Sequence, residues 1–155
     1  MIIGHMKPSK FTKNEISEHM LIRGHSFIKS AILLYEAGGS KDVELYNICQ
    51  GIEISLKSFL LFKDYNRYKP LLPKKKYFGH DLIKLFNEVK REYKLNELSS
   101  PVASELETLN TYYVNHYLRY SGIHDIFFPS TDVEYTLVIK KLFAGIKLAD
   151  RQKRK

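Results

Sequence analysis

Apolar positions recur at intervals of three and four residues along most of the chain, and few segments alternate with a period of two. This spacing is typical of amphipathic helices rather than of strands. It predicts helices over 12–37, 43–63, 80–93 and 101–121, and a last helix after residue 131. The sequence therefore predicts an all-α fold, an antiparallel bundle of four to five helices in a single domain.

Turn and capping residues mark the predicted helix ends. Gly38 and Gly39 stop the first helix, as glycine does at many helix C-termini. The predicted N-caps are Asp42 for the second helix, Ser100 (before Pro101) for the fourth, and Thr131, in a capping box with Glu134, for the last. We expect residues 1–11 to be a disordered or tag-like segment, 12–150 to be the helical domain, and 151–155 to be a basic tail.

The segment 64–79 interrupts the helical pattern between the second and third helices. Pro70 and Pro73 exclude a continuous helix, and Lys74, Lys75 and Lys76 follow them. The sequence thus predicts one long basic loop, whose lysines either contact phosphate or are solvated surface. His80 and Asp81, which come next (80–81), are expected to open the third helix, with the aspartate near the positive end of the helix dipole.

The charge balance favours an anionic partner without requiring one. Lysine and arginine number 25 against 17 aspartate and glutamate residues, a formal net charge of +8. Such a surplus attracts RNA, DNA or an acidic protein, and it also keeps a protein soluble. Cys49 is the single cysteine, which excludes an intrachain disulfide and favours a cytoplasmic protein. No signal peptide and no membrane span are expected, because no apolar run is long enough.

Metal and cofactor chemistry is not predicted. The six histidines contain no His-x3-His pair, Cys49 has no second cysteine, and no phosphate-binding glycine loop is present. Glu44 and Glu53 are expected on solvent-facing sides of the second helix, so they are not predicted to act as paired carboxylates. We therefore expect no metal and no cofactor.

The segment 112–124 contains the candidate binding residues. On the predicted helix 101–121, Tyr112, His116 and Tyr120 share one face, and Arg119 lies beside them. Aromatic rings stack on unpaired bases and arginine holds phosphate, which is typical of a nucleic-acid surface. The alternative is that the tyrosines are half-buried core residues with their hydroxyl groups at the rim.

Arg119 and His124 form a candidate catalytic pair. Cleavage of RNA without a metal requires a group that moves the proton of the ribose 2′-hydroxyl and a cation that stabilises the phosphate. Histidine titrates near neutral pH and can move the proton. Arginine can stabilise the phosphate oxygens. The two residues diverge on a continuous helix, but a break at Gly122 brings His124 back toward Arg119.

Three stretches in this order resemble a HEPN (higher eukaryotes and prokaryotes nucleotide-binding) domain. They are "GIEISLKSFLLF" (51–62), "GHDLIKLFNEV" (79–89) and "LNTYYVNHYLRYSG" (109–122), followed by a final helix. The family is all-helical and occurs in prokaryotic toxins, antiphage systems and companions of nucleotidyltransferases. The resemblance implies a homodimer, with a nucleotidyltransferase or an antitoxin as a further partner.

The resemblance implies two alternative activities. Many members are metal-independent endoribonucleases with an Arg-x4–6-His motif, which falls here on Arg119 and His124. A polar residue usually follows the arginine in those members, whereas Tyr120 stands here. Other members lack catalysis and bind RNA, nucleotides or a partner protein. The leading interpretation is RNA or nucleotide binding without robust catalysis. Ribonuclease activity and a pure protein-interaction module are the alternatives. The predicted binding residues are Lys74, Lys75, Lys76, Tyr112, His116, Arg119 and Tyr120.

Overall fold

A computed structural model describes residues 7–120 and 122–153, and every regular element in these residues is helical. The elements are α1 (Lys10–Glu36), α2 (Lys41–Lys63), α3 (Tyr65–Tyr68), α4 (Leu82–Tyr93), α5 (Ser100–Val114), α6 (His124–Phe127), the 3₁₀ turn η1 (Ser130–Asp132) and α7 (Thr136–Lys153). The predicted all-α single domain is confirmed.

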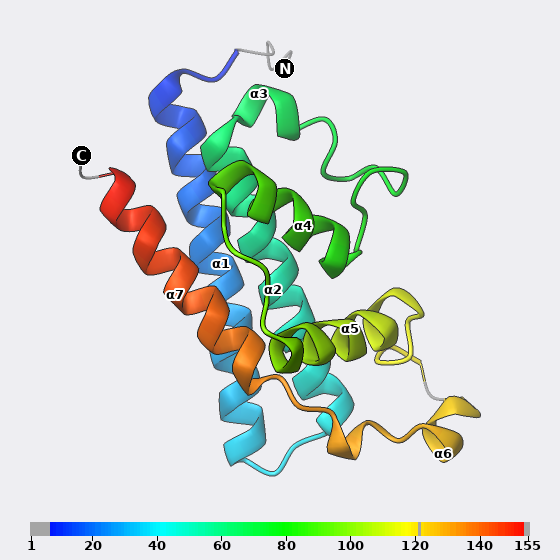
Figure 1. Cartoon of the computed structure of the whole chain (residues 1–155). Helices are drawn as coiled ribbons and strands as arrows, with labels where there is room; N and C mark the ends of the chain where they lie inside the picture. Colours follow the sequence, from blue (N-terminus) through cyan, green and yellow to red (C-terminus); the bar gives the residue numbers. More distant parts are fainter. Residues whose placement is uncertain (1–6, 121, 154–155) are drawn as a thin grey trace, which may run out of the picture.

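The antiparallel pair α1 and α2 forms the long axis of the molecule, with α4 and α5 on α2 and α7 beside α1 (Figure 1). Gly24 and Gly51 let the two helices approach closely. A Cβ atom on Gly24 would lie 2.4 Å from the Ser55 hydroxyl oxygen, and one on Gly51 would lie 2.8 Å from the Gly24 carbonyl oxygen. Both distances are too short for a real contact, so glycine is needed at this crossing.

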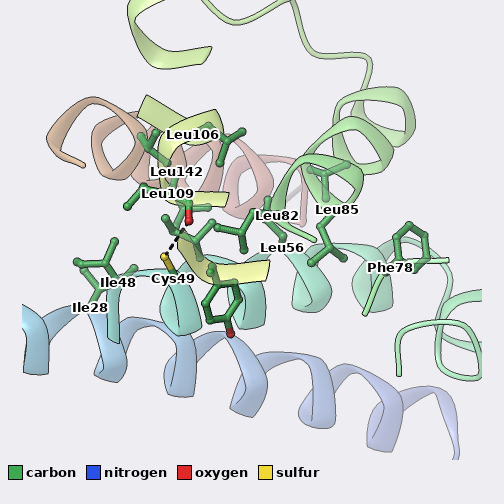
Figure 2. Packing of buried hydrophobic residues seen from close by; sticks show 14 of the residues in the cluster. Ile28, Ile48, Cys49, Leu56, Phe78, Leu82, Leu85, Leu106, Leu109 and Leu142 are labelled. Carbon is green, nitrogen blue, oxygen red and sulfur yellow. Dashed lines mark hydrogen bonds between the residues drawn. The ribbon is translucent and has the colours of Figure 1, made fainter. Parts of the chain in front are cut away.

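α2 is the central helix of the core, as its apolar pattern predicts. Figure 2 shows its side chains meeting those of α1, α4, α5 and α7. The thiol of Cys49 is buried and lies 3.9 Å from the Leu109 carbonyl oxygen of α5. The fully buried core side chains include Ile28, Leu45, Ile48, Leu60, Leu82, Leu85 and Leu109. Burial of this apolar surface is the main term that stabilises the fold.

Three helices end in the same way, and only one of them carries a glycine there. After α1, Gly38 has φ 68° and the Gly39 amide donates to the Leu34 carbonyl at 2.9 Å. This is the Schellman ending. Lys94 (φ 52°) takes the left-handed position after α4, and His116 (φ 60°) takes it after α5. The predicted helix 101–121 therefore ends too late: α5 stops at Val114, and the Tyr117 amide donates to the Tyr112 carbonyl at 3.1 Å.

The starts of four helices also differ from the prediction. Residue 9 caps α1, whose helix begins two residues earlier than expected: the Thr12 amide donates to the Ser9 hydroxyl at 3.1 Å. α2 begins after Ser40, so Asp42 lies in its first turn, and α5 begins after Ser99 instead of Ser100. The predicted capping box of Thr131 is wrong, because η1 occupies that position.

α7 begins at Thr136 and is capped from another helix. Glu105 of α5 accepts the Leu137 and Val138 amides at 2.9 and 3.0 Å. A carboxylate at this end is favourable because it satisfies free amides and complements the helix dipole. α7 extends to Lys153, into the predicted basic tail. The predicted N-terminal segment 1–11 lies mostly outside the described residues.

Candidate functional site

The lysine segment 64–79 is a compact series of turns rather than one open loop. It contains the short helix α3, and Tyr68, Leu72 and Phe78 are buried in the core. Lys74, Lys75 and Lys76 are exposed between these anchors. Apolar side chains on both sides of the lysines hold the turn against the bundle, which the prolines and lysines alone did not predict.

Arg119 lies in the turns beyond α5, on the ring of a tyrosine from α2. Its guanidinium carbon is 5.3 Å from the centre of the Tyr46 ring, a cation–π distance. The Gln50 amide donates to the Tyr46 hydroxyl at 2.9 Å and fixes that ring. Arg119 is exposed, and none of the carboxylates in 7–120 and 122–153 pairs with it. The site thus presents a positioned cation that is open to an anion.

The structure does not bring the predicted tyrosine face together. Because α5 ends at Val114, Tyr112, His116 and Tyr120 do not share a helical face. The Tyr112 hydroxyl donates to the carbonyl oxygens of Phe128 and Pro129 at 3.0 and 3.3 Å, which ties the chain back to α5. His116 is exposed, and Tyr120 is 71% exposed. Tyr112 is therefore a structural anchor, in line with the alternative considered for the tyrosines.

The predicted catalytic pair is described only in part. His124 opens the short helix α6, and its side chain lies outside the described residues. Figure 1 shows α6 apart from the helix bundle, beyond the end of α5. The geometry of Arg119 with His124 thus stays a prediction.

A cluster of four polar side chains lies where α2, α5 and the start of α4 meet. We call Glu53, Lys57, His80 and Tyr113 the polar cluster. The carboxylate of Glu53 accepts from the Lys57 ammonium at 2.6 Å, from the Tyr113 hydroxyl at 2.5 Å and from His80 Nδ1 at 2.9 Å. The side chains of Glu53 and Lys57 are 6% and 11% exposed, whereas that of His80 is 50% exposed.

The polar cluster keeps Glu53 ionised. Burial acts to raise the pKa of Glu53, but the hydrogen bond and charge of Lys57 and the hydrogen bonds of Tyr113 and His80 outweigh it, so the pKa is lowered. Burial and the nearby Glu53 charge raise the pKa of the Tyr113 hydroxyl. The expectation that Glu44 and Glu53 face solvent is wrong: both are buried, and Glu44 pairs with Lys41 at 2.8 Å. Their partners make this burial tolerable.

The start of α4 holds His80 beside the cluster. Asp81 Oδ1 accepts the Ile83 and Lys84 amides at 3.1 and 3.0 Å, as an N-cap does. Asn110 of α5 accepts the Leu82 amide at 2.8 Å. The expectation that Asp81 opens this helix is confirmed. His80 does more than open the helix, because its ring also joins the polar cluster.

A chain of rings connects Arg119 to His80. The centre of the Tyr46 ring lies 6.0 Å from that of Tyr113, and the Tyr113 ring lies 5.9 Å from His80 in an edge-on arrangement. Arg119, at one end, and His80, at the other, are both exposed. The roles of Tyr46, Tyr113 and Glu53 in this connection are not predicted from the sequence. The available signal was the spacing of Glu53 and Lys57, an acid and a base four positions apart inside the central helix α2.

No helix in residues 7–120 and 122–153 is long and apolar enough to cross a bilayer. The same residues contain no group of three or more histidine, cysteine, aspartate or glutamate side chains arranged to hold a metal ion. No family model, no curated protein and no solved structure matches the chain.

Proposed function

We propose that the chain is a HEPN-like helical domain of the cytoplasm that binds RNA or a nucleotide, without robust catalysis. The observation that carries this proposal is the open guanidinium of Arg119 on the Tyr46 ring, 5.3 Å from its centre. A guanidinium that lies over an aromatic ring still has N–H groups that can donate to phosphate oxygens. An aromatic ring beside it can also stack on a base.

The distribution of ion pairs supports the proposal. Lys41, Lys57, Lys90, Arg67 and Arg91 all pair with carboxylates. Within the described part of the chain, Arg119 and the three lysines 74–76 pair with none, a property that they share with other exposed cations such as Arg23 and Lys29. The predicted phosphate-binding residues are thus charges that the protein itself leaves unneutralised, which an anionic partner can use.

The apolar segment after Arg119 supports a homodimer. Five side chains there are between 66% and 77% exposed: Tyr120, Ile123, Ile126, Phe127 and Phe128. Side chains of this size present roughly 600 Å² of apolar surface per copy, which is at the upper end for an isolated monomer. Two copies together reach about 1,200 Å², the lower bound of a specific interface. A nucleotidyltransferase or an antitoxin is the alternative partner for this segment.

Binding of single-stranded RNA tests the proposal. We expect a fluorescein-labelled oligouridylate to bind at low salt and to dissociate as salt increases, because phosphate contacts release counterions. Arg119→Ala should weaken binding by about tenfold, the effect of one charge-assisted contact. The matched control is Arg23→Ala, which removes another exposed charge, from α1. Equal losses in the two variants, or no binding by the wild type, would contradict the proposal.

The endoribonuclease alternative, as a toxin or an antiphage effector, has a separate test. Cleavage of RNA that persists in EDTA and disappears in His124→Ala would establish it. Binding without cleavage leaves the proposal above as stated.

A further inference from the structure

His80 is the only member of the polar cluster whose side chain is half exposed; those of Glu53 and Lys57 are almost fully buried. Its Nδ1 faces inward, 2.9 Å from the Glu53 carboxylate. An ionised carboxylate only accepts, so Nδ1 carries a hydrogen in both charge states of the ring. Nε2 makes no hydrogen bond to the described residues. The neutral and the protonated ring therefore differ only in whether Nε2 carries a hydrogen.

We propose that His80 is a proton-gated phosphate ligand, whose outward Nε2 donates a hydrogen bond to a phosphate oxygen of the bound RNA or nucleotide only when the ring is an imidazolium. Glu53 fixes the ring through Nδ1. This inference rests on the proposed function and adds the residue that makes binding depend on pH.

Glu53 and Tyr113 are held in one protonation state by their surroundings. Histidine is the side-chain type that ordinarily titrates between about pH 5 and 8. The pKa of Glu53 is lowered and that of Tyr113 is raised, so neither titrates in this range. Lys57 already compensates the Glu53 charge through their 2.6 Å ion pair. A proton on His80 therefore adds a positive charge that the Glu53–Lys57 pair does not cancel. The ring that carries this charge is half exposed to solvent.

The backbone of the lysine segment lies close to His80, whereas the first amides of α4 are not free. Lys75 of the lysine segment 64–79 packs directly against Gly79, the residue before His80: a Cβ atom on Gly79 would lie 3.2 Å from Lys75 Cα. The first amides of α4 are already occupied by Asp81 and Asn110. Asp81, which is half-buried, and Lys84, which is exposed, form a pair at 3.8 Å that largely cancels their charges. An anion at this end of α4 would therefore bind through the His80 imidazolium and the lysine segment 64–79, and not through helix amides.

Two sources of phosphate share this chemistry: an internal phosphodiester and a terminal phosphate monoester. An oligouridylate with a 5′-hydroxyl end contains phosphodiesters only, which keep their charge across this range. A 5′-phosphate loses part of its charge as the pH falls toward 6, which acts against the proposed effect. Comparing the two oligonucleotides separates the sources.

Fluorescence anisotropy at constant ionic strength, from about pH 5.5 to about pH 8, tests the inference. We expect the wild type to bind about tenfold more weakly at the upper end. His80→Gln should remove this dependence, because its amide can still donate to Glu53 but cannot gain a proton. His19→Gln, on the exposed side of α1, is the matched control and should keep it. Circular dichroism shows whether each variant is folded.

NMR provides a second readout that needs no variant. By linkage, ligand that prefers the imidazolium raises the titration midpoint of the His80 ring, so saturating oligonucleotide should shift it upward. An unchanged midpoint, or the same pH dependence in His80→Gln as in the wild type, overturns the inference but leaves the proposed function intact. Absence of wild-type binding at every pH contradicts the proposed function itself. Binding that depends on pH only with the 5′-phosphate assigns a terminal monoester, and dependence with both oligonucleotides assigns a phosphodiester.

Discussion

The polar cluster and the apolar segment after Arg119 reverse the usual distribution of side chains in opposite ways. Glu53 and Lys57 are charged and buried, whereas Phe127 and Phe128 are apolar and about two-thirds exposed. The buried charges have partners within the chain, three of them on Glu53 alone. The exposed rings have no comparable cover among the described residues.

The polar cluster is thus stabilised by contacts within the chain, whereas the apolar segment requires a partner to cover it. The polar cluster is satisfied internally and positions His80, so its disruption should act first on folding. The apolar segment contributes little to the stability of the isolated chain, so its disruption should act on assembly. Four predictions test this division, in order of the expected change in the free energy of unfolding.

Glu53→Ala should have the largest effect. It leaves the buried Lys57 ammonium and the Tyr113 hydroxyl without an acceptor. We expect a loss of about 3–5 kcal/mol in the free energy of unfolding, as for other buried pairs that lose one partner, measured by urea denaturation. Glu107→Ala removes an exposed glutamate of α5 and should change it by less than about 0.5 kcal/mol. Similar values for the two variants would mean that the polar cluster does not support the fold.

Gly24→Ala should have the second largest effect, because α1 holds α2 and its cluster in place. The new methyl group would lie 2.4 Å from the Ser55 hydroxyl oxygen and 3.0 Å from the Gly51 carbonyl oxygen. Overpacking of this kind destabilises by about 1–3 kcal/mol. Gly145→Ala in α7 meets nothing within 4 Å and should stabilise by about 0.5–1 kcal/mol through helix propensity alone. Thermal unfolding of both variants measures the contrast; equal shifts would contradict close packing at Gly24.

The glycine crossing and the polar cluster also show how far the sequence alone could lead. The period of the apolar residues predicts the helices and α2 as the centre, because this signal is local and repeated. Glu53, Lys57, His80 and Tyr113 come from positions up to 60 residues apart. The spacing of Glu53 and Lys57 permits their pairing, but nothing local indicates that His80 and Tyr113 join them, and glutamate in a helix usually faces water. The buried network was therefore out of reach of a periodic pattern.

The end of α5 was misplaced for a related reason. A glycine in the sequence predicts a helix end with a left-handed residue, as at Gly38. His116 adopts the same conformation, but a histidine does not predict it. Histidine is among the non-glycine residues that tolerate this conformation. Arg119 is exposed, and its predicted role in binding stays a prediction. Its platform, Tyr46, comes from α2 and required the tertiary structure.

Acid pH should weaken the fold through the polar cluster. The pKa of Glu53 is below its ordinary value of 4.5 in the folded state. Its ionised form therefore stabilises the fold above about pH 4.5, and this contribution is lost as the pH falls through the folded pKa. We expect the advantage of the wild type over Glu53→Gln, measured by urea denaturation, to shrink below pH 4.5. An advantage that stays constant into acid would show that the Glu53 charge is not the source.

Replacement of Phe127 and Phe128 by serine should change the unfolding free energy least. Both rings are exposed, so their removal should alter the stability of the isolated chain by less than about 0.5 kcal/mol. We expect the same double variant to convert a dimer into a monomer, measured by light scattering, because an interface of this size depends on a few aromatic anchors. Phe11→Ser, which removes a 72% exposed ring from α1, should leave the dimer intact. A wild type that is monomeric at high concentration would instead assign the segment to a different protein partner, and a large loss of stability in the monomer would show that these rings belong to the fold.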